Sequence, residues 1–257
     1  MTRAARSLQF TNLPLVETVV RLYFPSNVRI DFRLVSDLHQ KLGSEFPNVS
    51  PPTLLETSPA LSSPQMLIAP GALPGAEYAG GPHGLSLHLQ QQMVAARWRR
   101  AISEHAPDYP RYGRLRKILH DAINHLQGCV GGAHLSPCIA NMTYVNFIRV
   151  ENPRPYLKDV HLTGTTIRAK TVQEQIVAWQ AQNGVDLRFE VRSAERTAGA
   201  EREGGYLLTT AAGRKLDPED DAFARLDDVH YELQVLFADL ISDRAKDEWG
   251  FSNGNAG

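Results

Sequence analysis

Long apolar runs and cysteine are scarce in this sequence, and neither sign of charge predominates. No uninterrupted apolar run approaches the about 18 residues that a membrane-spanning helix needs, and the opening MTRAARSLQF lacks the apolar core of a signal peptide. Two cysteines, Cys129 and Cys138, cannot build a disulfide framework, so stability must come from an ordinary core. These absences predict a cytoplasmic protein that makes no membrane contact.

The charge balance excludes an attraction of the whole protein to nucleic acid. Lys and Arg number 27, Asp and Glu number 28, and the formal charge is -1. No global field therefore draws the chain to nucleic acid or to an anionic membrane. The 257 residues, 42% hydrophobic and 21% charged, have the composition of a globular protein with one large domain or two small ones.

The segment LPLVETVVRLYF, residues 13–24, is rich in branched and aromatic residues and is followed by a proline, which predicts a strand. Side chains alternate along a strand. One face is predicted to belong to the core, and it consists of the alternate residues Val16, Thr18, Val20, Leu22 and Phe24. The other face carries Glu17 and Arg21 and is predicted to meet water or a partner. A carboxylate is costly to bury alone, so Arg21 is the expected partner of Glu17.

Hydrophobic periodicity places the other elements. The dipeptide Asn183-Gly184 between two strand-like segments predicts a hairpin with a type I′ turn. Asp217-Pro218 predicts the start of a long closing helix whose apolar stripe runs to Ile241, and His230 on that stripe is interpreted as a hydrogen-bonded core histidine. The further predictions are strands at 53–55, 65–69, 85–98, 141–150, 173–182, 185–193 and 206–211, helices at 30–46 and 111–128, a mobile loop at 71–84 and a solvated loop at 194–205.

This order favours an α+β fold with a mainly antiparallel sheet and two or three amphipathic helices, because strands rarely alternate with crossover helices. The predicted organisation is an N-terminal α+β half at 1–135, a C-terminal α+β half with the hairpin and closing helix at 136–250, and a disordered tail at 251–257. Both halves share a plan of opening strand, middle strands and closing helix, which would fit a duplication.

Several segments together carry a resemblance that spans nearly the whole chain: PLVETVVRLYFP, YPRYGRLRKIL, TYVNFIRV and LDDVHYELQVLFADL. Their order resembles a sporadically distributed family of uncharacterised prokaryotic proteins with a PLVE-like opening, a YP-x-Y helix start, a Y-x-N strand and a closing helix with leucine and histidine. The resemblance implies a bacterial origin and the patchy inheritance of mobile or defence loci, and no reaction. The residues that fit are Pro14, Leu15, Glu17, Pro25, Trp98, Tyr109, Pro110, Tyr112, Tyr144, Asn146, His230 and Phe237.

One segment is locally basic. It has seven cations and two acidic residues, Glu104 and Asp108, and it contains Trp98, Tyr109 and Tyr112. Guanidinium groups beside aromatic rings suit phosphate and base contacts. The alternatives are an acidic protein partner or simply a solvated helix face balanced by the acidic closing helix. The candidate residues for binding nucleic acid or a partner are Arg97, Trp98, Arg99, Arg100, Arg111, Arg114 and Lys117, and Arg116 adds to the charge.

Five potential metal ligands fall within residues 120–138: His120, His125, Cys129, His134 and Cys138. Zinc sites usually contain closely spaced ligand pairs, which are missing here. His120 and His125 stand about 140° apart around a helix and would not face one metal. We therefore predict no metal site and no cofactor, with packed thiols and surface histidines instead.

No phosphate-binding loop, nucleophile elbow or H-E-x-x-H motif occurs in the sequence. The preferred hypothesis is a non-catalytic binding subunit of a prokaryotic macromolecular assembly, defence-related or of the toxin–antitoxin type, with a protein partner. The alternatives are an RNA- or DNA-binding module that uses residues 97–117, and a metal-dependent enzyme that uses the Cys/His cluster. The sequence does not indicate the oligomeric state.

Overall fold

The computed structural model divides the chain into two compact units whose segments alternate along the sequence. Unit 1 comprises Met1–Val16, Met142–Arg214 and Asp227–Gly257, and unit 2 comprises Glu17–Asn141 and Lys215–Leu226. The structure describes residues 8–10, 12–52, 72–80, 84–100, 109–130, 135–158, 161–162, 165–166, 174–180, 184–198 and 201–253. The strands predicted at 53–55 and 65–69 lie outside the described residues.

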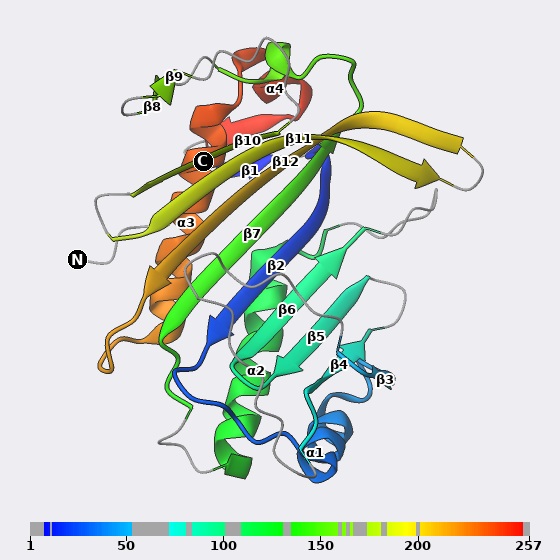
Figure 1. The fold of residues 1–257 in the computed structure, drawn as a ribbon, viewed down its shortest axis with the longest axis vertical. Coiled ribbons are helices and arrows are strands. Elements are labelled where there is room, and N and C mark those ends of the chain that lie inside the picture. The colour runs from blue at the N-terminus through cyan, green and yellow to red at the C-terminus, as the bar shows by residue number, and fades with distance from the viewer. Residues whose placement is uncertain are drawn as a thin grey trace. The chain divides into compact units, whose positions relative to one another are not determined.

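Unit 2 contains antiparallel strands and two helices (Figure 1). Its helices are α1 (Phe32–Leu42) and α2 (Arg111–Val130). Asp31 caps α1 by accepting a hydrogen bond from the Leu34 amide at 2.9 Å. The strands lie in the order β2 (Leu15–Tyr23), β6 (Met93–Arg99), β5 (Leu85–Gln90), β4 (Gly75–Ala79) and β3 (Asn48–Ser50).

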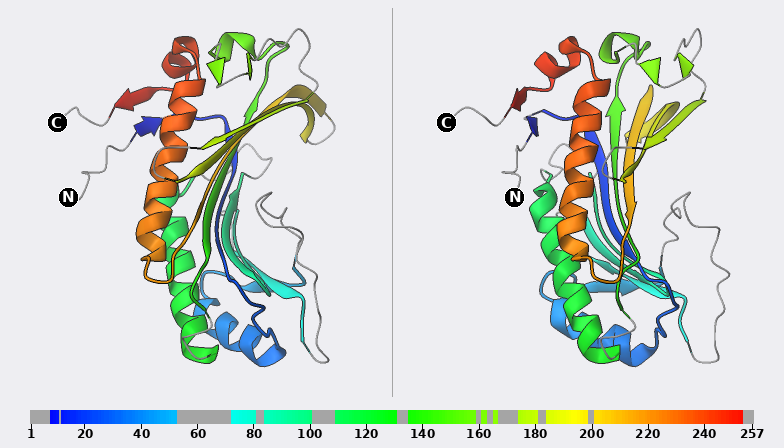
Figure 2. Two further views of the ribbon diagram at one scale, coloured as in Figure 1. Left: turned by 60° about the vertical axis from the view of Figure 1, so that its left-hand side comes forward. Right: turned by 90° about the vertical axis from the view of Figure 1, so that its left-hand side faces the viewer.

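Side chains on both faces of β2, β5 and β6 are buried. One face packs under α1 and α2 (Figure 2), where the Tyr78 hydroxyl donates to the Val35 carbonyl oxygen at 3.2 Å. Burial raises the pKa of Tyr78. On the opposite face Val19, Tyr23 and Met93 belong to a second apolar cluster. The prediction that this second face of β2 meets water or a partner is therefore wrong for Val19, Arg21 and Tyr23, because side chains of neighbouring strands cover these residues.

Three local predictions in unit 2 are wrong. The segment 85–98 is a hairpin of two strands, because Gln91 and Gln92 form a turn without glycine or asparagine. The predicted loop 71–84 contains strand β4, which pairs with β5 and buries Tyr78. The spacing of Phe32, Val35, Leu38 and Leu42 in the sequence predicts one apolar stripe for the first helix, but Phe32 is 76% exposed, and Leu34 lies inside instead.

Unit 1 contains the strand order β10 (Glu174–Gln180), β11 (Asp186–Ala198), β12 (Glu201–Lys215) and β7 (Ile139–Ile148), which Figure 1 shows side by side. The predicted hairpin is confirmed, with Gly184 at φ 78°. The helix α3 (Ala222–Leu240) buries Val229, Leu233 and Leu236 as its stripe predicts. The smaller elements are β1 (Leu8–Phe10), η2 (Arg154–Tyr156), β8 (His161–Leu162), β9 (Thr165–Thr166), α4 (Asp243–Glu248) and β13 (Phe251–Asn253).

Three further predictions are wrong, in β11 and β12, at the start of α3 and at residues 251–253. Residues 194–198 and 201–205 belong to the long antiparallel pair of β11 and β12 and not to a solvated loop. Asp221 caps α3 through the Phe223 amide at 2.9 Å, so the helix begins later than Asp217-Pro218 indicates. Residues 251–253, expected in a disordered tail, pair with β1, because the Phe251 ring packs on Phe10 at 5.0 Å.

The fold class is confirmed: the protein is α+β, with mainly antiparallel strands and few helices. Within the described ranges, no helix has both the length and the apolar character needed to cross a bilayer.

Candidate functional site

The basic residues of β6 point to different surroundings. Arg97 lies on the face remote from α2 and donates from Nε to Glu17 Oε1 at 3.0 Å. Trp98 points to the opposite face, is 2% exposed and packs on Tyr109 with ring centroids 5.2 Å apart. Arg99 and Arg100 are exposed at the end of the strand. The candidate residues on β6 therefore separate into a buried ion pair, a core aromatic ring and two surface cations.

Arg111, Arg114 and Lys117 of α2 are exposed, and two of them form ion pairs, whereas Arg116 is half-buried over the Phe223 ring. Arg114 donates to Glu45 at 2.7 Å, and Lys117 pairs with Asp121 one helical turn away. Arg111, the first residue of the helix, is exposed and has a φ of 70°. This left-handed conformation is uncommon for any residue with a side chain other than asparagine or aspartate.

The contact between Trp98 and Tyr109 brings the two parts of the basic segment together, because it joins the end of β6 to the residues that precede α2. Three exposed arginines flank this contact in the chain: Arg99, Arg100 and Arg111. We call these three arginines the basic junction. Among the described residues none of the three makes a salt bridge, whereas Arg97, Arg114 and Lys117 each do.

A buried ionic cluster on the face remote from α1 and α2 escaped the sequence analysis. His88, in the middle of β5, is fully buried, and its Nε2 lies 2.8 Å from Ser86 Oγ and 3.8 Å from Glu77 Oε1. Burial lowers the pKa of His88 to about 4, against the opposing effect of Glu77. The imidazole is therefore neutral at pH 7. In the sequence, the signal for this site was the polar residue His88 between Leu87 and Leu89. Alternation of apolar and polar residues is also typical of a strand with one face in water, so the pattern alone did not indicate a buried histidine.

Two further contacts extend this cluster along the same face. Glu17 pairs with Arg97, and Arg21 donates from Nη1 to Asn141 Oδ1 at 3.0 Å. The prediction that Arg21 is the partner of Glu17 is therefore wrong, because the neighbouring strand offers a cation at a better distance than the same strand does. Charges in such surroundings require partners, and each of these groups has one.

Ser86, His88 and Glu77 have the residue types of a catalytic triad but a different geometry. In a triad the hydroxyl and the carboxylate bind opposite nitrogens of the imidazole. Here both lie at Nε2, while Nδ1 is buried and makes no hydrogen bond within the described structure. His88 is also 0% exposed. This arrangement suits a structural network that fills the face of the sheet.

The predicted Cys/His ligands do not converge where the structure describes them. His125 Nε2 contacts Cys129 Sγ at 3.6 Å, while His120 lies beside Asp121 and Asn124. Cys138 packs against the apolar cluster of Val19 and Tyr23. No group of three potential ligands forms among the described residues, and His134 lies outside them.

Unit 1 brings together two residues that carry the family resemblance. His230 on α3 shares a hydrogen bond with Tyr144 on β7, with Nε2 and Oη 3.1 Å apart. Burial lowers the pKa of His230 to about 4. This contact confirms that His230 is hydrogen-bonded, whereas the residue is half-buried and does not belong to the fully buried core.

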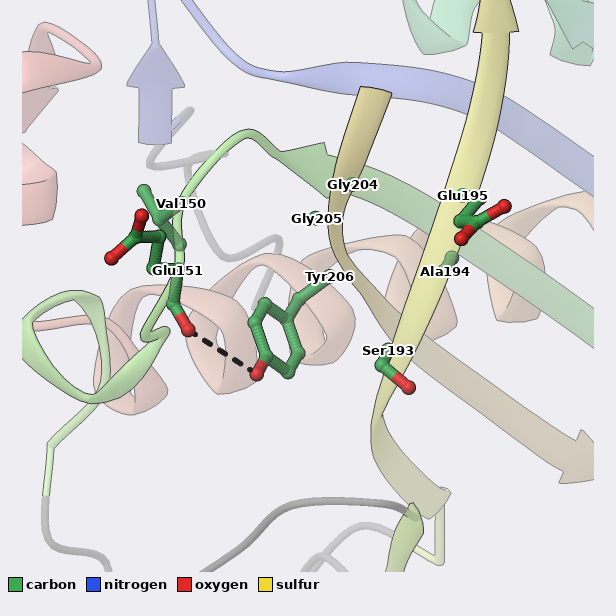
Figure 3. A pocket seen from close by; sticks show the side chains of 8 residues that line it. All are labelled: Val150, Glu151, Ser193, Ala194, Glu195, Gly204, Gly205 and Tyr206. Atoms are coloured by element: carbon green, nitrogen blue, oxygen red, sulfur yellow. Dashed lines mark hydrogen bonds between the residues drawn. The ribbon is translucent and has the colours of Figure 1, made fainter. Parts of the chain in front are cut away.

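A pocket of about 610 Å³ opens in unit 1 beside the hairpin of β11 and β12 (Figure 3). The Tyr206 hydroxyl donates to the Glu151 carbonyl oxygen at 3.4 Å and holds the ring at the wall. The lining residues are Val150, Glu151, Ser193, Ala194, Glu195, Gly204, Gly205 and Tyr206. The sequence analysis placed 194–205 in a loop and so could not identify this pocket.

No known family model matches this chain, and no curated protein sequence matches it either.

Proposed function

We propose that this protein is a non-catalytic binding subunit of a prokaryotic macromolecular assembly, defence-related or of the toxin–antitoxin type, and that the basic junction binds an acidic surface of a protein partner. The observation that carries the proposal is the exposure of Arg99, Arg100 and Arg111 without salt bridges among the described residues. The prokaryotic setting rests on the sequence resemblance.

The backbone of Arg111 supports this assignment. A left-handed φ costs a residue with a Cβ about 1–2 kcal/mol, so the fold alone favours glycine or asparagine at this position. Strained residues persist at sites where their side chains have a use. An exposed guanidinium offers the fold little in return, which points to a contact outside the chain.

The environment of the aromatic residues favours a protein over single-stranded nucleic acid. Base stacking requires an accessible ring face. Trp98, the predicted platform, is 2% exposed and packs against Tyr109 within unit 2. The cations that remain suit carboxylates, to which guanidinium groups bind in a bidentate manner.

The geometry of the buried ionic cluster supports a non-catalytic role. The carboxylate of Glu77 and the hydroxyl of Ser86 lie at the same nitrogen of His88, and the ring is inaccessible to substrate. Its polar groups bind one another across the strands, as groups that stabilise a sheet face do.

The test is affinity purification from a bacterial host that encodes the protein, with tagged wild-type chain and a variant carrying Arg99→Ser, Arg100→Ser and Arg111→Asn. Asparagine tolerates the left-handed backbone and removes the charge. The matched control removes three other exposed cations of unit 2, by Arg29→Ser, Arg33→Ser and Lys41→Ser. Bound proteins and nucleic acids are both identified, and affinity for each purified protein is measured.

We expect a stoichiometric acidic protein that binds wild type and control alike and binds the junction variant about tenfold more weakly, since three surface ion pairs at about 0.5 kcal/mol each give that factor. Equal binding by the junction variant would overturn the proposal. Release of the partner by nuclease, with a steep salt dependence, would instead identify RNA or DNA as the ligand.

A further inference from the structure

The pocket beside β11 and β12 exists because a strand residue lacks a side chain. Glu195 pairs with Gly204 across the two strands, and Ser193 pairs with Tyr206. Cross-strand partners project to the same face, so these four residues share one face of the hairpin. Gly204 leaves a hollow in that row, between the Tyr206 ring and the carboxylate side chain opposite (Figure 3).

The structure explains only one of the two adjacent glycines of β12, Gly204 and Gly205, by close packing. A Cβ at Gly205 would approach the Ile148 carbonyl oxygen to 2.4 Å and the Phe147 ring to 2.8 Å, so close packing requires glycine there. A Cβ at Gly204 would meet nothing within 4 Å, and its φ is not in the left-handed range. Glycine weakens a strand interior by its conformational freedom. Neither the backbone nor the packing calls for it at 204, whereas an open pocket does.

Among the side chains that the structure describes, the lining of this pocket has acidic and aromatic character and includes no basic residue. Glu151 and Glu195 lie on opposite sides of Tyr206, and both residues are exposed, so their carboxylates give the surroundings of the pocket negative charge (Figure 3). An aromatic face attracts cations through its quadrupole. Ser193 adds a hydroxyl that accepts hydrogen bonds. The volume of about 610 Å³ lies in the range of ordinary ligand sites.

We infer that this pocket binds an alkylammonium or guanidinium group, which enters the space above Gly204 and contacts the Tyr206 ring. The source is either a lysine or arginine side chain of a polypeptide or a free amine. This inference is independent of the basic junction, because it concerns other residues and a ligand of opposite charge.

The test follows the backbone amide signals of Gly204 and Gly205 by NMR during titration with three probes. Nα-acetyl-lysine methylamide represents a polypeptide side chain, putrescine represents a free amine, and Nα-acetyl-norleucine methylamide is the uncharged counterpart. Gly204→Leu places a side chain in the pocket at a position where its Cβ would meet nothing within 4 Å, and Gly113→Leu is the control at an equally open glycine of α2. The variant pair Glu151→Gln and Glu195→Gln removes the negative charge.

We expect saturable shifts with at least one of the two cations, weakened about tenfold or more by Gly204→Leu and by the charge variant, and unchanged in the control. Stronger binding of the lysine derivative assigns the site to polypeptides, and stronger binding of putrescine assigns it to free amines. Shifts with norleucine equal to those with lysine, an undiminished response in Gly204→Leu, or no response to either cation would overturn the inference. Amide signals distant from the pocket report whether each variant is folded.

Discussion

Glu17 on β2 accepts a hydrogen bond from Arg97 on β6 at 3.0 Å, diagonally across the two strands. The register places Arg97 opposite Val19, so the guanidinium reaches one step along the neighbouring strand to the carboxylate. The exposed fractions of the two side chains are 15% for Arg97 and 22% for Glu17. Arg97, a candidate for partner binding by sequence, has a structural role through this contact.

Substitution of this carboxylate should therefore destabilise the fold. Glu17→Gln leaves a mostly buried guanidinium without its counter-charge, and we expect the free energy of unfolding to fall by about 1–3 kcal/mol in urea titrations. The control is Asp37→Asn, whose partner Arg33 is 90% exposed, with an expected loss below about 0.5 kcal/mol. Similar losses for the two variants would contradict the structural role of the pair.

Trp98 should behave as a core residue and not as a ligand contact. Trp98→Ala removes a ring that is 2% exposed and packed on Tyr109, and we expect a loss of about 3–5 kcal/mol in the free energy of unfolding. Phe32→Ala, at a ring that is 76% exposed, is the control and should change stability by less than about 0.5 kcal/mol. A stable Trp98→Ala protein would return the tryptophan to the candidate binding residues.

Two histidines should make stability dependent on pH. Burial lowers the pKa of His88 and of His230 to about 4, from 6.5 in the unfolded chain. Between pH 4 and pH 6.5 the two histidines are protonated in the unfolded chain but mostly neutral in the folded protein. The free energy of unfolding therefore falls as the pH falls from about 6.5 towards 4. Near pH 5 each histidine contributes a slope of about 1.2 kcal/mol per pH unit.

The measurement is the free energy of unfolding between pH 7 and pH 5, by urea titration at each pH. His88→Gln should remove about half of the slope that the two histidines produce, and a variant with His230→Gln as well should remove the remainder. An unchanged slope in both variants would show that these imidazoles are protonated in the folded protein.

The two adjacent glycines of β12 should respond oppositely to alanine. Gly205→Ala forces a methyl group against the Ile148 carbonyl oxygen and the Phe147 ring, and we expect a loss of about 1–3 kcal/mol. Gly204→Ala meets no neighbour and should leave stability unchanged or raise it by up to about 1 kcal/mol, since it reduces the freedom of the unfolded chain. Thermal unfolding of both variants decides whether β12 approaches β7 as closely as described.

The sequence predicted an element correctly where the apolar spacing or the turn residues within that element were enough to define it. The helix α2 and the stripe of α3 followed from apolar spacing, and the hairpin of β10 and β11 followed from Asn183-Gly184. Strand β4 and the turn at Gln91 were missed, because their stability comes from pairing with β5 and from burial of Tyr78, which lie elsewhere in the sequence. The strand at residues 251–253 was missed for the same reason, because the Phe251 ring packs on Phe10, which is far away in the sequence.

The candidate site shows the same division. Composition and spacing identified a cluster of cations near residues 97–117, but they could not separate its buried members from its exposed ones. Alternation along β6 places Arg97 and Trp98 on opposite faces of the sheet. What each face contacts depends on the neighbouring strands and helices, which the local sequence does not specify. By itself the amino-acid order determined the α+β class, the apolar stripe of α3 and the pairing of β10 with β11, since these depend mainly on interactions between residues near in sequence. Tertiary structure alone decided the partners of Glu17 and His88 and the hollow at Gly204, because those groups meet residues that only strand pairing brings within reach.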